Sequence, residues 1–146
     1  MKNIIVEGPG CPSKKKLVRE LVNCTKWKIA RCPANSSFKK FSDLLKEENT
    51  IFDGFFLKAH IRPILKHKVN NLTLLEYSKL CELVKSNKSV YIIFFPDTYK
   101  KSSLKEIELY HMYAVKFNEE HKYKKFYVLY ENDWEEKIDD IIGEIL

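Results

Sequence analysis

The stretch NIIVEGPGCPSKK, residues 3–15, decides the fold of this chain. Residues 3–7 form a mainly apolar run, as in a strand that is buried on both faces of a parallel sheet. A turn rich in glycine and proline follows, and over residues 13–24 apolar side chains recur at the spacing of a helix. A buried strand that leads through a tight turn into a helix is typical of a parallel α/β fold.

The turn has the frame of a phosphate-binding loop, or P-loop, whose pattern is G-x-x-x-x-G-K-[ST]. In that motif backbone N–H groups wrap a phosphate, the lysine reaches the β- and γ-phosphates, and the hydroxyl holds Mg²⁺. Gly8 and Lys14 are in register with the motif, and Gly10 lies inside the loop. Ser13 replaces the second glycine and Lys15 replaces the hydroxyl, so the loop lacks its Mg²⁺ ligand, because Mg²⁺ requires oxygen.

Strand-like and helix-like segments alternate along the rest of the chain. Hydrophobic patterns and β-branched residues predict strands at residues 3–7, 27–30, 50–53, 90–95 and 125–130. Helices are predicted at residues 13–24, 37–47 and 55–67. Three further helices are predicted to begin at capping residues, namely Thr73, Ser103 and Asn132. Strands that are separated by helices pair in parallel, because a parallel connection needs about a dozen residues or more. The expected fold is α/β, with three layers and a five-stranded, mostly parallel sheet flanked by helices.

Length and composition predict a single domain over residues 1–146. With 146 residues, 45% of them hydrophobic, the chain can bury roughly two-thirds of its unfolded surface around one core. No apolar run is long enough to cross a membrane, and the first strand is too short for the core of a signal peptide. Four cysteines without a C-x-x-C pair and four histidines without H-E-x-x-H predict neither a metal site nor a disulfide framework. We expect a cytoplasmic protein without membrane association.

The opening residues 4–9, IIVEGP, are similar to the start of thymidylate kinases and of related deoxynucleoside and deoxynucleotide kinases, many of them phage-encoded. Three later segments resemble parts of that family in the same order. Residues 51–53 resemble the strand that carries its Asp-Arg pair, residues 89–96 resemble its fourth strand, and residues 125–130 resemble its last strand. The resemblance covers nearly the whole chain, mostly as pattern. It implies a P-loop kinase-like fold, ATP and Mg²⁺ as cofactors of an active enzyme, and Asp53 as a possible acceptor-site residue.

The other motifs of the family are altered in this chain. Gly54 occupies the place of the arginine in the Asp-Arg pair, and Lys58 occupies a place often held by serine. The family's lid supplies arginines to the phosphates, whereas the segment between Pro96 and His121 offers only lysines. An arginine finger contributes about 10³–10⁵ in rate, so efficient catalysis is not expected and no catalytic residue is assigned. A structural role for Asp53, capping the turn after its strand, is an equal alternative. The phosphate-binding residues are interpreted as a relict set: Gly8, Gly10, Ser13, Lys14 and Lys15.

These residues suggest functions from three classes. The first is a pseudokinase, inactive or nearly so in phosphoryl transfer, which acts by binding a protein partner. A phage protein that targets a host factor in the host cytoplasm fits this interpretation. The second is a divergent but active nucleotide kinase in which Lys14 and Lys15 hold the phosphates of ATP. The third is a basic nucleic-acid-binding protein, suggested by the net charge of +6.

We favour the pseudokinase, because the loop glycine, the Mg²⁺ ligand and the arginines are replaced together. This interpretation requires no cofactor, although binding of a nucleotide or phosphate at the relict loop is compatible with it. Nucleic-acid binding is the least expected function, since lysine-rich surfaces also suit an anion site and acidic protein partners.

Overall fold

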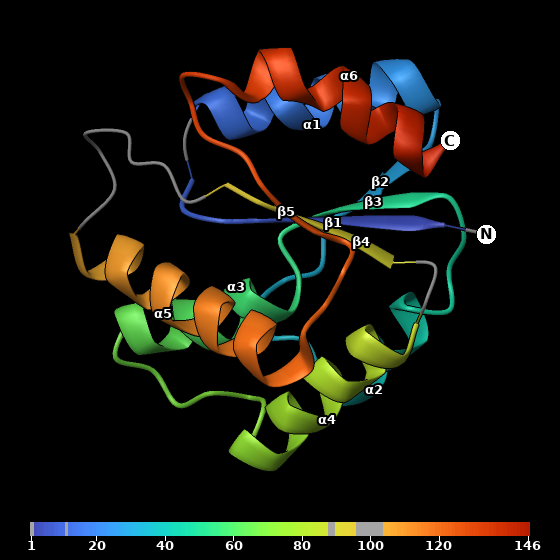
Figure 1. Ribbon diagram of the computed structural model, residues 1–146. Coiled ribbons are helices and arrows are strands. Elements are labelled where there is room, and N and C mark those ends of the chain that lie inside the picture. Colours follow the sequence, from blue (N-terminus) through green and yellow to red (C-terminus); the bar gives the residue numbers. More distant parts are fainter. Residues whose placement is uncertain (1, 11, 88–89, 96–103) are drawn as a thin grey trace.

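The computed structural model describes residues 2–10, 12–87, 90–95 and 104–146, which form three layers (Figure 1). The middle layer is a sheet of β1 (Asn3–Glu7), β2 (Lys28–Ala30), β3 (Thr50–Asp53), β4 (Val90–Phe94) and β5 (Phe126–Val128). One face is covered by α1 (Pro12–Thr25) and α6 (Trp134–Ile145). The other face is covered by α2 (Phe38–Leu44), α3 (Phe56–Leu65), α4 (Leu74–Ser86) and α5 (Leu104–His121). The predicted three-layer α/β fold is confirmed.

The strand order is β2-β3-β1-β4-β5, and every strand pair in the described part of the chain is parallel. Strand β1 is therefore central, with Ile5 opposite Phe52 of β3 and Ile92 of β4. Because the strands are parallel, their carboxyl ends lie along one edge of the sheet. Ligands of open α/β sheets bind outside this edge, where the strand order reverses. The loop after β1 occupies that position.

The central strands are apolar because helices cover both of their faces. All five residues of β1 and all five of β4 are buried. Alternate residues of β1 face opposite sides of the sheet: Ile5 packs in the core next to α2–α5, whereas Ile4 and Val6 pack in the core next to α1 and α6. The first of these cores is aromatic, with four fully buried phenylalanines: Phe41, Phe52, Phe55 and Phe56.

The sequence predicts the elements correctly and errs at some of their ends. The edge strands β2 and β5 have three residues each, fewer than the predicted 27–30 and 125–130, because each has a neighbour on one side only. The capping box at Thr73 and Glu76 is confirmed by both hydrogen bonds. The expected cap at Asn132 is wrong: Asp133 precedes α6, and its carboxylate accepts the N–H of Tyr130 in the turn before it. Ser103 lies outside the described residues.

Among the residues that the structure describes, no helix combines the length and the apolar character needed to span a membrane.

Helix α3 ends in a Schellman motif two residues after an internal proline. The Lys68 N–H donates to the Pro63 carbonyl at 2.9 Å, and the His67 N–H donates to the Ile64 carbonyl at 3.2 Å. His67 has a φ of 51°, in the left-handed region that glycine adopts without steric cost. The motif ends the helix earlier than the predicted residue 67 and holds Lys68 against its last turn.

We expect His67→Gly to raise the free energy of unfolding by about 0.5–1 kcal/mol, because glycine removes the steric cost of the left-handed conformation. The matched control is His67→Ala, which removes the same imidazole but keeps a Cβ, and which should give no gain. Urea unfolding followed by circular dichroism measures both variants. Equal changes in the two variants would show that backbone strain at His67 is not the cause.

Candidate functional site

The loop after β1 begins at a glycine that the packing requires. Gly8 is buried with a φ of 142°, and a Cβ at this position would clash with the carbonyl oxygen of Phe95. The Phe95 N–H donates to the Glu7 carbonyl at 2.8 Å, which brings the chain after β4 against the loop. A Cβ at Gly10, by contrast, would meet no atom within 4 Å. The fold therefore explains the glycine at position 8 and does not explain the one at position 10.

The start of α1 brings the predicted phosphate-binding residues together. The Lys14 ammonium donates to the Gly8 carbonyl at 3.0 Å, so it lies across the loop. Ser13 is buried, and its hydroxyl donates to the Glu131 carboxylate at 3.0 Å. Glu131 lies in the turn before α6, far from the loop in sequence. A carboxylate at the loop opposes the entry of a phosphate, because both are negatively charged.

The first turn of α1 carries Lys14, Lys15 and Lys16 and no acidic residue. Each cation at a helix N-terminus costs roughly 0.3–1 kcal/mol, because the helix dipole is positive there, and an anion bound at the same end offsets this cost. Lys15 is exposed and offers no oxygen at the position where the motif holds Mg²⁺. The loop can attract an anion, but Lys15 gives it no ligand for the accompanying metal.

A buried carboxylate lies at the base of the loop. Glu7, the last residue of β1, is fully buried, and its two carboxylate oxygens accept the N–H groups of Phe55 at 2.9 Å and Leu57 at 2.5 Å. It thereby caps α3, whose own N-cap residue Phe55 makes no side-chain cap. Burial raises the pKa of Glu7 to about 7, although the backbone hydrogen bonds and the charge of Lys14 oppose this rise. The signal in the sequence was a charged residue at the end of an apolar strand.

Asp53, the predicted acceptor-site residue, lies at the carboxyl end of β3 opposite Val6 of β1. Its Oδ2 atom is 3.8 Å from Nε of Arg31, which follows β2. The chain turns directly after Asp53, where the Gly54 N–H donates to the Val6 carbonyl at 2.8 Å and Gly54 has a φ of 79°. The structure therefore places Asp53 at the same sheet edge as the loop. Its cationic neighbour is Arg31, to which the sequence patterns assign no role.

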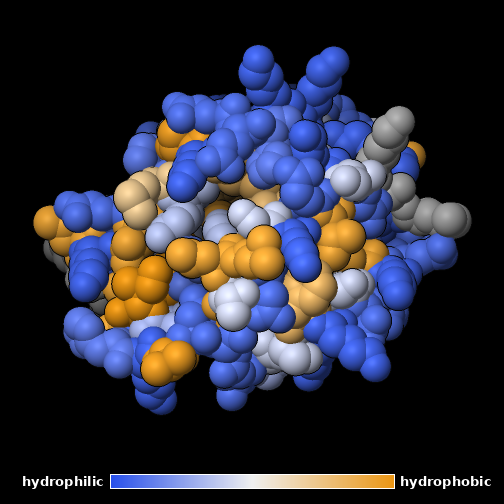
Figure 2. All heavy atoms as spheres, turned by 90° about the horizontal axis from the view of Figure 1, so that it is seen from below, coloured by the Kyte–Doolittle hydropathy of each residue, from blue (hydrophilic) through white to orange (hydrophobic). Residues whose placement is uncertain are grey.

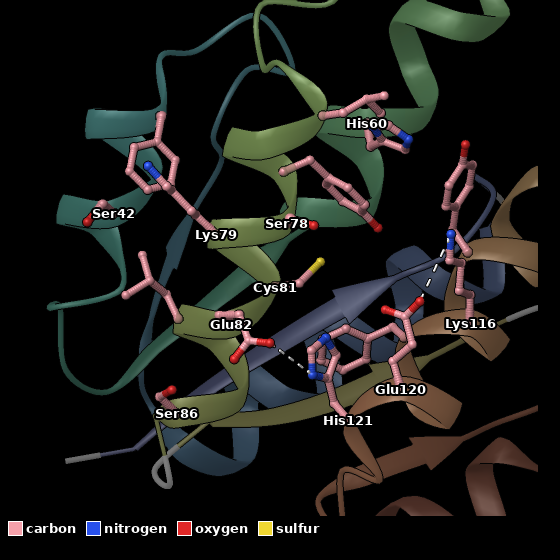
Figure 3. A pocket seen from close by; sticks show the side chains of 16 residues that line it. Ser42, His60, Ser78, Lys79, Cys81, Glu82, Ser86, Lys116, Glu120 and His121 are labelled. Atoms are coloured by element: carbon pink, nitrogen blue, oxygen red, sulfur yellow. Dashed lines mark ion pairs between the residues drawn. The ribbon is translucent and has the colours of Figure 1, made fainter.

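A groove of about 850 Å³ lies between α4 and α5, and no residue of the loop lines it. Figure 2 shows hydrophobic side chains around a hollow on this face of the molecule. His60 of α3 is buried in the groove, stacks on Tyr77 at 4.0 Å between ring centroids, and has no hydrogen-bond partner for Nδ1 among the described residues. Burial lowers the pKa of His60. Elsewhere in the groove, His121 Nδ1 lies 3.6 Å from Glu82 (Figure 3). The groove has the size and aromatic lining of a binding site.

Solved structures with a similar fold bind nucleotides. The YorR protein from Bacillus subtilis, in complex with phosphorylated GDP, aligns with a TM-score of 0.69 and 20% identity over 99% of this chain and 95% of its own. NadR, in complex with NAD and AMP-PNP, aligns with a TM-score of 0.58 and 11% identity over 99% of this chain and 49% of its own. Deoxyadenosine kinase from M. mycoides, with dCMP and a flexible dCDP, aligns with a TM-score of 0.54 and 16% identity over 98% of this chain and 97% of its own.

No protein-family model and no curated protein sequence matches the chain. The structural similarity confirms a P-loop kinase-like fold.

We expect Glu7→Leu to lower the free energy of unfolding by about 1–3 kcal/mol at pH 5, because leucine offers no acceptor to the two buried N–H groups. Glu48→Leu is the matched control: Glu48 is exposed, and the change should stay within about 0.5 kcal/mol. Urea unfolding of the three proteins measures both effects. A loss of similar size in both variants would exclude the buried cap as its cause.

The same carboxyl group predicts a pH dependence. Its pKa rises from an ordinary value of 4.5 to about 7 on folding, so the folded chain holds an extra proton between these values. The stabilisation is complete below pH 4.5 and is lost as the pH rises through about 7, which amounts to roughly 3 kcal/mol. The stability advantage of the wild type over Glu7→Leu should therefore shrink from pH 5 to pH 8. An advantage that grows with pH would mean that the hydrogen bonds from the N–H groups lower the pKa of Glu7 by more than burial raises it.

Proposed function

We propose that this protein is a pseudokinase: a degenerate nucleotide-kinase-like protein that does not transfer phosphoryl groups efficiently and acts by binding a protein partner. The observation that carries the proposal is Lys15 in the first turn of α1, where the motif needs a hydroxyl. Phosphoryl transfer depends on a metal ion that neutralises the developing charge, and an ammonium at its binding position repels that ion. The Glu131 carboxylate, which accepts the hydrogen bond of Ser13, brings a negative charge to the first turn of α1.

The acceptor side of the sheet edge supports the same conclusion. Asp53 is paired with Arg31, and the arginine that follows this aspartate in the resembling family is Gly54 here. The side chain of Lys58 packs over Gly54, so a Cβ at position 54 would overlap the Lys58 stem. An arginine could not be accommodated at position 54 without displacing Lys58. Position 54 therefore supplies no guanidinium to the transferred phosphate.

Binding of a protein partner is supported by the groove between α4 and α5. Its lining includes Leu74 and Leu83, which are 77% and 39% exposed, together with aromatic rings of α4 and α5. Exposed apolar side chains that border a hollow are typical of interaction sites. A phage origin and a location in the host cytoplasm belong to the same proposal.

A divergent, active kinase is the second candidate, favoured by one observation. Lys14 lies in register with the motif and reaches the first glycine of the loop, as a phosphate-binding lysine should. In this alternative ATP and Mg²⁺ are required, and Lys14 is indispensable.

We expect the wild type to show no Mg²⁺-dependent binding of ATP or GTP by calorimetry at millimolar nucleotide. The double variant Ser13→Gly, Lys15→Thr restores the backbone approach and the Mg²⁺ ligand, and it should gain about tenfold or more in Mg²⁺-dependent ATP affinity. Lys16→Thr removes one exposed charge from the same helix turn and serves as the control, with no such gain.

A transfer assay distinguishes the two candidates. Mg²⁺-dependent transfer of the γ-phosphate from ATP to a deoxynucleoside or its monophosphate by the wild type, abolished by Lys14→Ala, would refute the pseudokinase and establish the active kinase.

A further inference from the structure

A basic hollow of about 410 Å³ lies beside α3, between the segment after β2 and the connection from α3 to α4. Four of its lining residues are cationic: Lys58, Arg62, Lys66 and Lys68. The other lining residues are apolar or carry neutral amides, and none is acidic. No residue of the loop after β1 lines it. The basic hollow is therefore separate from the relict phosphate site.

The four cations are not neutralised by the described part of the protein. None of them forms an ion pair with another described residue. The Arg62 guanidinium lies close enough to the Tyr110 hydroxyl to lower its pKa against the effect of burial, and one neutral hydroxyl engages only part of a group with five N–H donors. Like charges four residues apart destabilise a helix. An anionic occupant would offset this repulsion.

Helix stability alone does not explain the arrangement. The helix dipole favours Arg62 in the last turn of α3 and Lys66 at its C-cap, but it disfavours Lys58 in the first turn. Lys68 lies beyond the helix and is held against it by its hydrogen bond to the Pro63 carbonyl. The helix dipole therefore does not account for all four cations, although all four line the same hollow.

The spacing of the cations indicates an extended ligand. Lys58, Arg62 and Lys66 follow one another at steps of four residues, which is about 6 Å per step along a helix axis. Side chains on one face of an extended peptide repeat at roughly 6.5–7 Å. Carboxylates at alternate positions of such a peptide therefore match the spacing of Lys58, Arg62 and Lys66. A single phosphate could contact only two neighbouring cations of these three.

The uncharged lining indicates a peptide ligand. Pro33 and Val69 offer exposed apolar contacts, and Val69 is 96% exposed. These surfaces suit aliphatic side chains between the carboxylates. Proteins that bind single-stranded nucleic acid stack its bases on aromatic rings, and no aromatic residue lines the basic hollow.

We propose that the basic hollow binds an extended, acidic segment of a protein partner, with carboxylates at alternate positions. This inference rests on the proposed partner-binding function and adds the chemistry of the partner.

The test is fluorescence anisotropy of a labelled peptide of alternating glutamate and valine, titrated with the full chain. We expect saturable binding that weakens as salt is raised. Lys66→Glu with Lys68→Glu should weaken it about tenfold or more, because two attractive contacts become repulsive. The control pair, Lys122→Glu with Lys124→Glu in the turn after α5, makes the same change in net charge at exposed positions outside both the basic hollow and the groove. It should change affinity less than about twofold. Circular dichroism checks that both double variants are folded.

Three results would overturn the inference: absence of binding at low salt, equal weakening by the two charge-reversal pairs, or tighter binding of single-stranded oligothymidylate that the Lys66 and Lys68 reversals abolish. The last result would assign the basic hollow to nucleic acid. None of these measurements depends on phosphoryl transfer, and the Lys66 and Lys68 changes leave the loop after β1 intact. A kinase activity found in the wild type would therefore refute the pseudokinase without deciding what the basic hollow binds.

Discussion

The buried carboxylate of Glu7 is the constraint on which the sheet edge depends. Its side chain accepts the N–H groups of Phe55 and Leu57 at the start of α3, while its carbonyl accepts the N–H of Phe95 after β4. One residue therefore joins the central strand to a helix and to the chain beyond the next strand, at the point where the loop begins. The direction in which α3 leaves the sheet follows from these hydrogen bonds. The position of the basic hollow, which is built on α3, follows from them as well.

The same edge bears on the weak phosphate binding that we propose for the loop despite its three lysines. In a working loop, the lysine and the backbone meet the phosphate. Here the Ser13 hydroxyl donates to the carboxylate of Glu131. A phosphate would have to approach this carboxylate without a metal ion held at position 15. The row of cations on α3 differs, because no described carboxylate pairs with it.

The sequence predicts those parts of the structure that local patterns encode. Strands β1 and β4 are buried throughout and mainly apolar, because both of their faces are covered. The capping box at Thr73 satisfies the N-terminus of its own helix. The bonds that shape the candidate site join distant residues: Glu7 and Phe55 are 48 positions apart, and Ser13 and Glu131 are 118 apart. No periodicity or motif reveals such pairs, since they exist only once the strand order brings the elements together. The same holds for the basic hollow, whose lysines look like a solvated helix surface in the sequence alone.

The altered motif itself separates structural from chemical requirements. Gly8 is required by packing, because a Cβ would clash with the Phe95 carbonyl whatever the loop binds. Gly10 has open space around it, and positions 13 and 15 carry a buried serine and an exposed lysine. Gly8 still matches the motif, and the fold itself requires a glycine there. Ser13 and Lys15 depart from the motif, at positions where a bound nucleotide would require a glycine and its metal ion a hydroxyl. This pattern fits the proposed pseudokinase, in which the fold keeps its need for Gly8 and no bound metal demands a hydroxyl at position 15.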